Sequence, residues 1–237
     1  MQELIQSGLA QLGLTGQTPQ AAPAQLERFG RLLLEKNQVM NLTAITDPRD
    51  VATLHMLDCA ALLGCGDFAS KALIDVGTGA GFPGVPLKIL APSLRVTLLD
   101  SLNKRVDWLG EVCEALSLDS IEAVHARAEE AAHDPAHRER YDFATARAVA
   151  DLRVLCELCL PFVKEGGYFL SMKGADCGAE LDSALPAIRA LGGEVERCRD
   201  YAIPHTDVHH RVILIKKTAP TPFQYPRRWA KIQKSPL

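Results

Sequence analysis

A run of glycines directly after a short apolar segment is the part of this sequence best suited to ligand binding. Residues 72–76 are long enough for a buried strand and too short for a helix. Gly77, Gly79 and Gly81 follow, and a helical pattern begins at Val85. Glycines let a backbone approach a ligand closely, and a helix N-terminus presents free N–H groups. Strand, glycine turn and helix together predict a cofactor site in an open α/β sheet.

A carboxylate further along the chain indicates what kind of cofactor this site would hold. Residues 95–99 form a second apolar strand pattern that ends in Asp100, about 20 residues after the glycine turn. A carboxylate in that position can accept hydrogen bonds from both hydroxyls of a ribose. The glycine turn and Asp100 together therefore predict a nucleotide-type ligand.

The identity of that nucleotide has two candidates. Gly79, Gly81 and Gly84 satisfy the G-x-G-x-x-G pattern, so a nicotinamide-dependent Rossmann oxidoreductase is one alternative. Pro83 interrupts the turn where a dinucleotide loop needs its helix to begin, and the carboxylate of Asp75 would repel a pyrophosphate. An anion there suits a cationic ligand, and S-adenosyl-L-methionine carries a sulfonium and an ammonium but no phosphate. The residues favour S-adenosyl-L-methionine.

The elements that must position these residues alternate regularly from residue 72 onwards. Strands are expected near 72–76, 95–100, 121–125, 142–147, 166–172, 195–201 and 210–216. Helices are expected between them at 84–91, 102–117, 151–162 and 178–191. This alternation predicts an α/β fold with a parallel, doubly wound sheet, whose last two strands form an antiparallel pair at one edge. Helical patterns near 2–14, 24–36 and 47–63 predict a helical cap before the sheet.

The chain is expected to have three parts. They are an N-terminal helical cap packed on the core (1–70), the core (71–217) and a basic C-terminal tail (218–237). The net charge is only −3, but no acidic residue follows Asp207, whereas seven lysines and arginines do. A basic end on a mildly acidic protein indicates local contact with a polyanion. A tail that is basic only for solubility is the open alternative.

Composition narrows the class and compartment of the protein. Hydrophobic residues make up 47% and charged residues 23%, as in an ordinary globular protein. The apolar runs are too short for a membrane span and no secretory signal stands out, so we expect a cytoplasmic protein without membrane contact. Seven cysteines, an odd number, fit free thiols. Cys156 and Cys159 have C-x-x-C spacing, but they lie in an apolar helical pattern, so we expect core residues rather than a metal or redox site.

Short motifs spread along the chain are similar to those of one known family. They are Asn41-Leu42-Thr43-Ala44-Ile45, His55-Met56-Leu57-Asp58, the segment from Asp75 to Leu87, the segment from Leu99 to Arg105, Arg127-Ala128-Glu129, Ala146-Arg147-Ala148 and Met172-Lys173-Gly174. Together they resemble the RsmG (glucose-inhibited division protein B) family of 16S rRNA guanine-N7 methyltransferases. The resemblance runs from about residue 25 to the end; Cys59 departs from it, because serine is more frequent there.

The resemblance implies a Rossmann-like S-adenosylmethionine-dependent methyltransferase fold with a seven-stranded, mostly parallel sheet. It also implies methyl transfer from S-adenosyl-L-methionine to N7 of one guanine in 16S rRNA, with the small ribosomal subunit as partner. The glycine turn and the resemblance give these candidate cofactor-binding residues: Gly77, Gly79, Gly81, Phe82, Asp100, Ser101, Leu102, Ala128, Glu129 and Arg147.

The implied reaction does not require a general base, because guanine N7 carries a lone pair and no proton. The enzyme must hold nucleophile, methyl group and sulfur in line at about 3–3.5 Å. No catalytic residue is therefore named with certainty. Arg147, at the end of the fourth strand, is a positioning candidate for the methionine carboxylate or for O6 of the guanine. Its alternative is a structural ion pair with Asp142 or Asp151.

Candidate RNA contacts lie on several elements. They are Asn41, His55, Lys104, Arg105, Lys173, Arg211, Arg227 and Arg228. A solvated helix face is the alternative for Lys104 and Arg105, and a structural histidine is the alternative for His55. We expect a monomer that binds no metal. A methyltransferase for another RNA or a small molecule and a non-catalytic RNA-binding module stay open as alternative functions.

Overall fold

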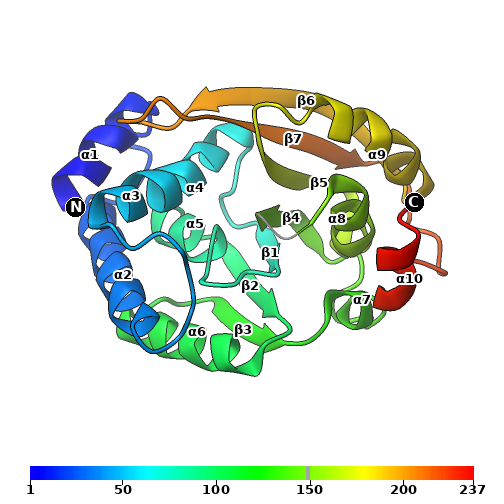
Figure 1. Cartoon of the computed structure of the whole chain (residues 1–237), viewed down its shortest axis with the longest axis horizontal. Coiled ribbons are helices and arrows are strands. Elements are labelled where there is room, and N and C mark those ends of the chain that lie inside the picture. The colour runs from blue at the N-terminus through cyan, green and yellow to red at the C-terminus, as the bar shows by residue number, and fades with distance from the viewer. Residues whose placement is uncertain (148–149) are drawn as a thin grey trace.

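The computed structural model describes residues 1–147 and 150–237, so Ala148 of the Ala-Arg-Ala motif lies outside the described residues. A seven-stranded sheet has the order β3-β2-β1-β4-β5-β7-β6 (Figure 1). The strands are β1 (Ala72–Val76), β2 (Arg95–Asp100), β3 (Ile121–His125), β4 (Tyr141–Arg147), β5 (Val163–Gly174), β6 (Gly193–Ala202) and β7 (His209–Lys217). The first five are parallel, and β7 runs antiparallel to both β5 and β6. The predicted mostly parallel sheet with an antiparallel edge is confirmed.

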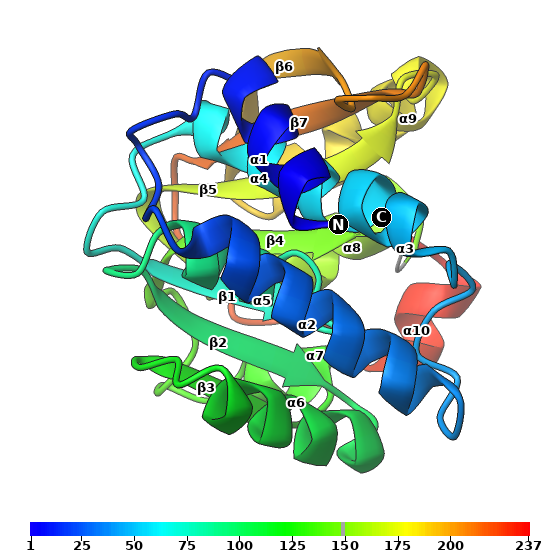
Figure 2. The ribbon, with the colours of Figure 1, turned by 90° about the vertical axis from the view of Figure 1, so that its left-hand side faces the viewer.

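Helices cover both faces of this sheet. One face carries α1 (Gln2–Gln11), α2 (Ala22–Asn37), α5 (Gly84–Leu90) and α6 (Asn103–Ala115), and Figure 2 shows α2 lying across it. The other face carries α7 (Ala128–Ala131), α8 (Leu152–Cys159), the 3₁₀ turn η3 (Leu160–Phe162), α9 (Gly178–Ala190) and α10 (Trp229–Lys234). Each face has its own cluster of buried apolar side chains. This explains why β1 and β2, which lie in the middle of the parallel part, read as nearly continuous apolar runs.

Residues of β1 show how the two clusters divide the sheet. Leu73 packs into the cluster beneath α2, whereas Ile74 and Val76 pack into the cluster beneath α8. Alternate side chains of a strand point to opposite faces, and both faces are covered here, so all three side chains are buried. No helix in the described part of the chain is long and apolar enough to cross a membrane.

The N-terminal helices share the core with the sheet helices on the same face. Phe29 of α2 packs against Phe82 at 5.2 Å and against Trp108 of α6 at 6.4 Å between ring centroids. The predicted helical cap is therefore present, in contact with the glycine turn. The division into parts at residues 70 and 217 stays a prediction.

The third predicted helix, near 47–63, is a continuous helical run with a change of geometry inside it. The run consists of α3 (Pro48–Asp50), the π-helix η1 (Val51–Leu57), α4 (Asp58–Ala60) and the 3₁₀ turn η2 (Ala61–Cys65). Asp47 caps its start by accepting hydrogen bonds from the amides of Arg49 and Asp50, as the Asp-Pro pattern predicts. The sequence contains no signal for the π-helix, which changes the hydrogen bonding of the Leu54 carbonyl in the cleft described below.

The C-terminal tail is fastened to the sheet helices by a buried ion pair. The backbone N–H, Nε and Nη2 of Arg227 donate to the carboxylate of Glu157 in α8 at 2.6–2.8 Å. The Glu157 side chain is fully buried, whereas Arg227 is 20% exposed. Removing one partner of such a pair lowers the stability of the protein, because the remaining charge is left buried without a partner.

Replacing Arg227 with Ala is therefore expected to lower the free energy of unfolding by about 3 kcal/mol. Arg228→Ala removes the same charge from an exposed neighbour and is expected to change that energy by less than about 0.5 kcal/mol. Urea unfolding of the two variants and of the unchanged protein measures the difference. Equal stabilities of the two variants would contradict the anchoring role.

Candidate functional site

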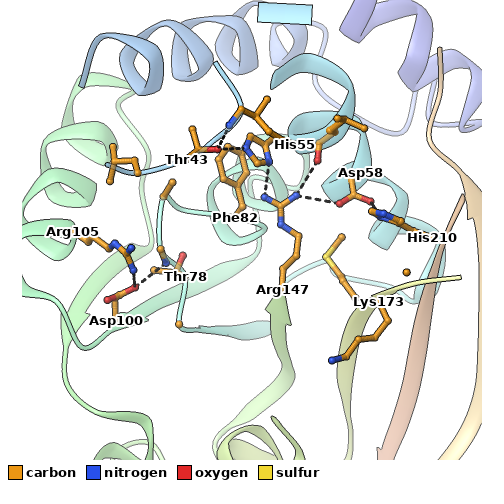
Figure 3. A pocket seen from close by; sticks show the side chains of 18 of the residues that line it. Thr43, His55, Asp58, Thr78, Phe82, Asp100, Arg105, Arg147, Lys173 and His210 are labelled. Carbon is orange, nitrogen blue, oxygen red and sulfur yellow. Dashed lines mark hydrogen bonds and ion pairs between the residues drawn. The ribbon is translucent and has the colours of Figure 1, made fainter. Parts of the chain in front are cut away.

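A cleft of about 980 Å³ opens at the carboxyl ends of β1, β2, β4 and β5. The strand order changes direction between β1 and β4, which is where open α/β sheets bind ligands. The glycine turn and the end of β2 line one end of the cleft, and the loop 42–45, η1 and the ends of β4 and β5 line the other (Figure 3). The cleft therefore has two ends of different chemistry.

The glycine turn is shaped by a carboxylate beneath it. Gly77, Gly79 and Gly81 have φ values of 68°, 59° and 93°, a region that side-chain-bearing residues rarely adopt. Oδ2 of Asp75 accepts a hydrogen bond from the Thr78 hydroxyl at 2.7 Å and from the Gly84 amide at 2.9 Å. Asp75 thus holds the turn and the first residue of α5 together.

Asp75 is fully buried and does not line the cleft, so it lies below the turn rather than facing a ligand. Burial raises its pKa from 3.8 to about 6, while the hydrogen bonds from Thr78 and Gly84 act in the opposite direction. Its Oδ1 has no hydrogen-bond partner among the described residues. The carboxylate is therefore costly to ionise, and its structural work depends on Oδ2.

Asp100 closes the same end of the cleft. Its Oδ2 accepts from the Gly79 amide and its Oδ1 from the Leu102 amide, both at 2.9 Å. Arg105 Nη1 lies 3.5 Å from Oδ2, at the mouth of the cleft. A carboxylate offers about four lone-pair sites, so Asp100 keeps capacity for further donors. Ser101 and Leu102 beside it are exposed and line the cleft.

The other end of the cleft is built around Arg147. Its Nη1 donates to Asp58 Oδ2 and to the Leu54 carbonyl, each at 3.1 Å, and its Nη2 lies 2.8 Å from His55 Nδ1. The guanidinium carbon lies 5.0 Å from the centroid of the Phe82 ring, on which His55 also stacks at 4.4 Å. Figure 3 shows these groups converging on Arg147. The side chain of Arg147 is 16% exposed and that of Asp58 is 1% exposed, so the ion pair is largely shielded from water.

The π-helix makes this arrangement possible. The Asp58 amide donates to the carbonyl of Thr53, five residues back, rather than to that of Leu54, four residues back. The Leu54 carbonyl accepts from Arg147 instead. The wider turn therefore aims a backbone acceptor and the His55 and Asp58 side chains at the same guanidinium.

Asp58 is the most enclosed charge of the cleft, at 1% exposure. Besides Arg147 it accepts from the Tyr201 hydroxyl at 2.6 Å, and His210 Nδ1 lies 2.8 Å away. Burial alone would raise the pKa of Asp58, but the hydrogen bond from His210 and the charge of Arg147 outweigh it, so the pKa lies below its ordinary value. The bond to Asp58 in turn raises the pKa of His210. Asp58 is therefore an anion at neutral pH.

The structure brings most of the predicted cofactor residues to one cleft. The residues that line it are Gly77, Gly79, Phe82, Asp100, Ser101, Leu102 and Arg147. Gly81 shapes the turn without lining the cleft, while Ala128 and Glu129 lie half-buried in α7 after β3 and away from the lining. Their contact with a cofactor stays a prediction.

The predicted RNA contacts divide into two groups. His55, Arg105 and Lys173 line the cleft, and Lys173 also donates to Glu180 and to the Ala150 carbonyl. The other predicted contacts do not line the cleft. Asn41, Lys104 and Arg228 are exposed, and the first two are neighbours in sequence of lining residues. Arg211 pairs with Asp200, and Arg227 pairs with Glu157. RNA contact by either group stays a prediction.

Sequence reasoning missed Thr43 and His210 in the lining and Tyr201 behind it. Tyr201 and His210 face each other across β6 and β7, a pairing that the strand register alone reveals. Thr43 lies in a motif noted in the sequence, but nothing local indicates its bond to His55. The two C-x-x-C cysteines lie buried as free thiols in α8, where burial raises the pKa of Cys156 and Cys159.

Comparison with known proteins gives consistent results. A family model described as rRNA small subunit methyltransferase G matches residues 22–212. The chain is 47% identical over 214 residues to the ribosomal RNA small subunit methyltransferase G of Alkaliphilus metalliredigens, covering 90% of each chain. It is 50% identical over 206 residues to the protein of the same name from Acetivibrio thermocellus, covering 87% of this chain and 85% of that one.

A solved structure supports the fold. The branched-chain polyamine synthase of Thermus thermophilus superimposes with a TM-score of 0.60 at 15% identity, covering 86% of this chain and 65% of that one. At this identity the likeness concerns the fold alone.

Asp75 generates a pH-dependent prediction. In the folded state this carboxyl binds its proton more tightly than in the unfolded chain, so its contribution to stability falls as pH rises between about pH 4 and pH 6. Asp75→Asn removes that titration. The free energy of unfolding of the variant relative to the unchanged protein is expected to rise by up to about 3 kcal/mol across this window.

Urea unfolding at several pH values between about 4 and 7 measures this difference. Asp107→Asn makes the same chemical change at an exposed position on α6 and is the matched control. A curve for the Asp75 variant that runs parallel to that of the unchanged protein would show that this carboxyl does not titrate in the window.

Proposed function

Because the chain belongs to the rRNA small subunit methyltransferase G family, we propose that it transfers a methyl group from S-adenosyl-L-methionine to N7 of a specific guanine in 16S rRNA. Membership makes the chain a methyltransferase and sets aside the nicotinamide-dependent alternative. The observation that carries the proposal is the single cleft shared by a nucleoside-type end, at Asp100, and a polar end around Arg147. One cleft can therefore hold both a cofactor and a base.

The residues of the first end fit S-adenosyl-L-methionine. A Cβ added at Gly79 would meet nothing closer than the Gly77 carbonyl at 3.9 Å, so the turn leaves open space beside the cleft. The free lone pairs of Asp100 suit two ribose hydroxyls, and the exposed Leu102 offers an apolar surface to a purine. The cofactor supplies a methyl group on a positively charged sulfur.

The residues of the other end suit a reaction that needs positioning rather than proton transfer. Guanine N7 has a lone pair and no proton, so no general base is required. Positive charge develops on the purine as the methyl group arrives, and a bare cation in the wall would oppose it. Asp58 compensates Arg147, so the wall presents a hydrogen-bonded pair instead. Phe82, between Arg147 and the glycine turn, forms an apolar floor.

The substrate side of the proposal includes the small ribosomal subunit as partner and the cytoplasm as the place of action, since that is where ribosomal RNA is found. Arg105 and Lys173 line the cleft and would meet phosphates of the RNA around the target guanine. A monomeric state stays a prediction.

The decisive experiment uses small ribosomal subunits from a strain lacking this gene, incubated with the protein and methyl-labelled cofactor. Label in 7-methylguanosine at one position of the 16S rRNA is the expected result. Label only on naked or precursor RNA would assign an earlier assembly stage as substrate. No label on any RNA, with cofactor still bound, would overturn the proposal in favour of a small-molecule substrate.

Cofactor binding gives a separate prediction. Asp100→Ala removes the acceptor for two backbone amides and for the ribose, so the affinity for S-adenosyl-L-methionine is expected to fall by about 10-fold or more. Asp107→Ala, on the exposed side of α6, should bind as the unchanged protein does. Titration calorimetry measures both, and full affinity in the Asp100 variant would remove this residue from the cofactor site.

A further inference from the structure

The direction of the hydrogen bonds that leave Arg147 is fixed by chemistry. A guanidinium has N–H donors and no acceptor, so His55 Nδ1, 2.8 Å from Arg147 Nη2, must accept. A neutral imidazole carries one proton, which is then on Nε2. Burial, together with the charge of Arg147, lowers the pKa of His55 to about 3, so the ring is neutral at physiological pH. His55 therefore donates from Nε2.

The hydroxyl oxygen of Thr43 accepts that hydrogen bond and a second one. Its Oγ1 lies 2.9 Å from His55 Nε2 and 3.0 Å from the backbone N–H of Ile45. A hydroxyl has two lone pairs and one proton, so both lone pairs are occupied and only the proton is available. Thr43 lines the cleft, and its hydroxyl donates to no other group in the described ranges. The hydroxyl is thus a donor that cannot also accept.

We propose that Thr43 donates this hydrogen bond to O6 of the target base and thereby selects guanine over adenine. The inference rests on the proposed function. On the edge next to N7, guanine presents the acceptor O6, whereas adenine presents an amino donor. An ordinary hydroxyl rotates to suit either base. Here the hydrogen bonds from His55 and from the Ile45 amide have removed that freedom, so adenine would face donor against donor.

O6 is also the group that this contact can use without harm to the reaction. A donor on N7 would occupy the lone pair that must attack the methyl group, whereas a donor on O6 leaves N7 free. Three of the five N–H groups of Arg147 are committed to Asp58, Leu54 and His55. The bond to His55 also sets the direction in which Thr43 donates, which makes Arg147 and His55 positioning residues.

A purely structural role for the Thr43 hydroxyl is the competing explanation, and the loop itself counters it. Asn37 holds the same loop through three other bonds: its Oδ1 accepts from the amides of Leu42 and Thr43, and its Nδ2 donates to the Thr43 carbonyl. These involve the backbone of Thr43 and not its side chain. Replacing the side chain therefore leaves the main fastening of the loop in place.

The test combines a protein change with a base change. Thr43→Val removes the hydroxyl at nearly constant volume, and Thr43→Ser retains it. The base at the methylated position, located by the subunit experiment above, is guanine or 2-aminopurine, which keeps N7 but lacks O6. The kcat/KM for methyl transfer is measured for each protein on each RNA, with thermal unfolding and cofactor affinity as controls.

The ratio of kcat/KM on guanine to kcat/KM on 2-aminopurine is expected to be about 10-fold larger for the unchanged protein than for Thr43→Val. The reason is that the valine substitution and the loss of O6 remove the same hydrogen bond. Thr43→Ser should keep the preference to within about 3-fold. If Thr43→Val loses activity equally on both bases, the hydroxyl does not contact O6 and the inference is overturned. If the valine variant does not fold, the unchanged protein still tests the inference. Equal kcat/KM values of the unchanged protein on guanine and on 2-aminopurine would overturn it. Absence of methylation of any guanine-containing RNA is instead a failure of the proposed function.

Discussion

The buried ion pair between Arg147 and Asp58 is the interaction on which the cleft depends, because four separate parts of the chain meet there. Arg147 ends β4, Asp58 lies in the helical run 48–65, and Tyr201 and His210 reach the same carboxylate from β6 and β7. A charge at 1% exposure is tolerated only with several partners. The pair therefore fixes the position of the helical run over the sheet, and with it one wall of the cleft.

A second buried carboxylate fixes the opposite wall in the same way. Asp75 lies under the glycine turn and accepts from Thr78 and Gly84, while Asp100 accepts from Gly79 above it. Glycine turns have few side-chain contacts of their own, so an anchored carboxylate on each side supplies the rigidity that the backbone lacks. Phe82 follows this turn and packs against His55 and Phe29, which couples both walls to α2.

The sequence was sufficient for the sheet and for bringing the glycine turn and Asp100 to one end of the cleft, because both depend on local patterns. Strand periodicity, the glycine turn and the position of Asp100 are properties of neighbouring residues. The polar end depends on contacts between distant residues. Tyr201 faces Asp58 only because β6 and β7 pair in one register, with an irregularity between Val195 and Arg197 that decides which side chains face inward. No local pattern encodes this, and the same holds for the π-helix.

The polar network has a physical character that suits its reaction. Arg147 can only donate, Asp58 can only accept while ionised, and neutral His55 transmits the direction of donation without exchanging a proton. Arg147, Asp58 and His55 are each held in one protonation state, since the pKa of His55 and that of Asp58 are both displaced downward from their ordinary values. These three groups are therefore poor general acids or bases near neutral pH and form a good fixed template. Methyl transfer to an atom that already carries a free lone pair requires a template and not a proton acceptor, so the geometry of this wall and the chemistry of the reaction impose the same demand.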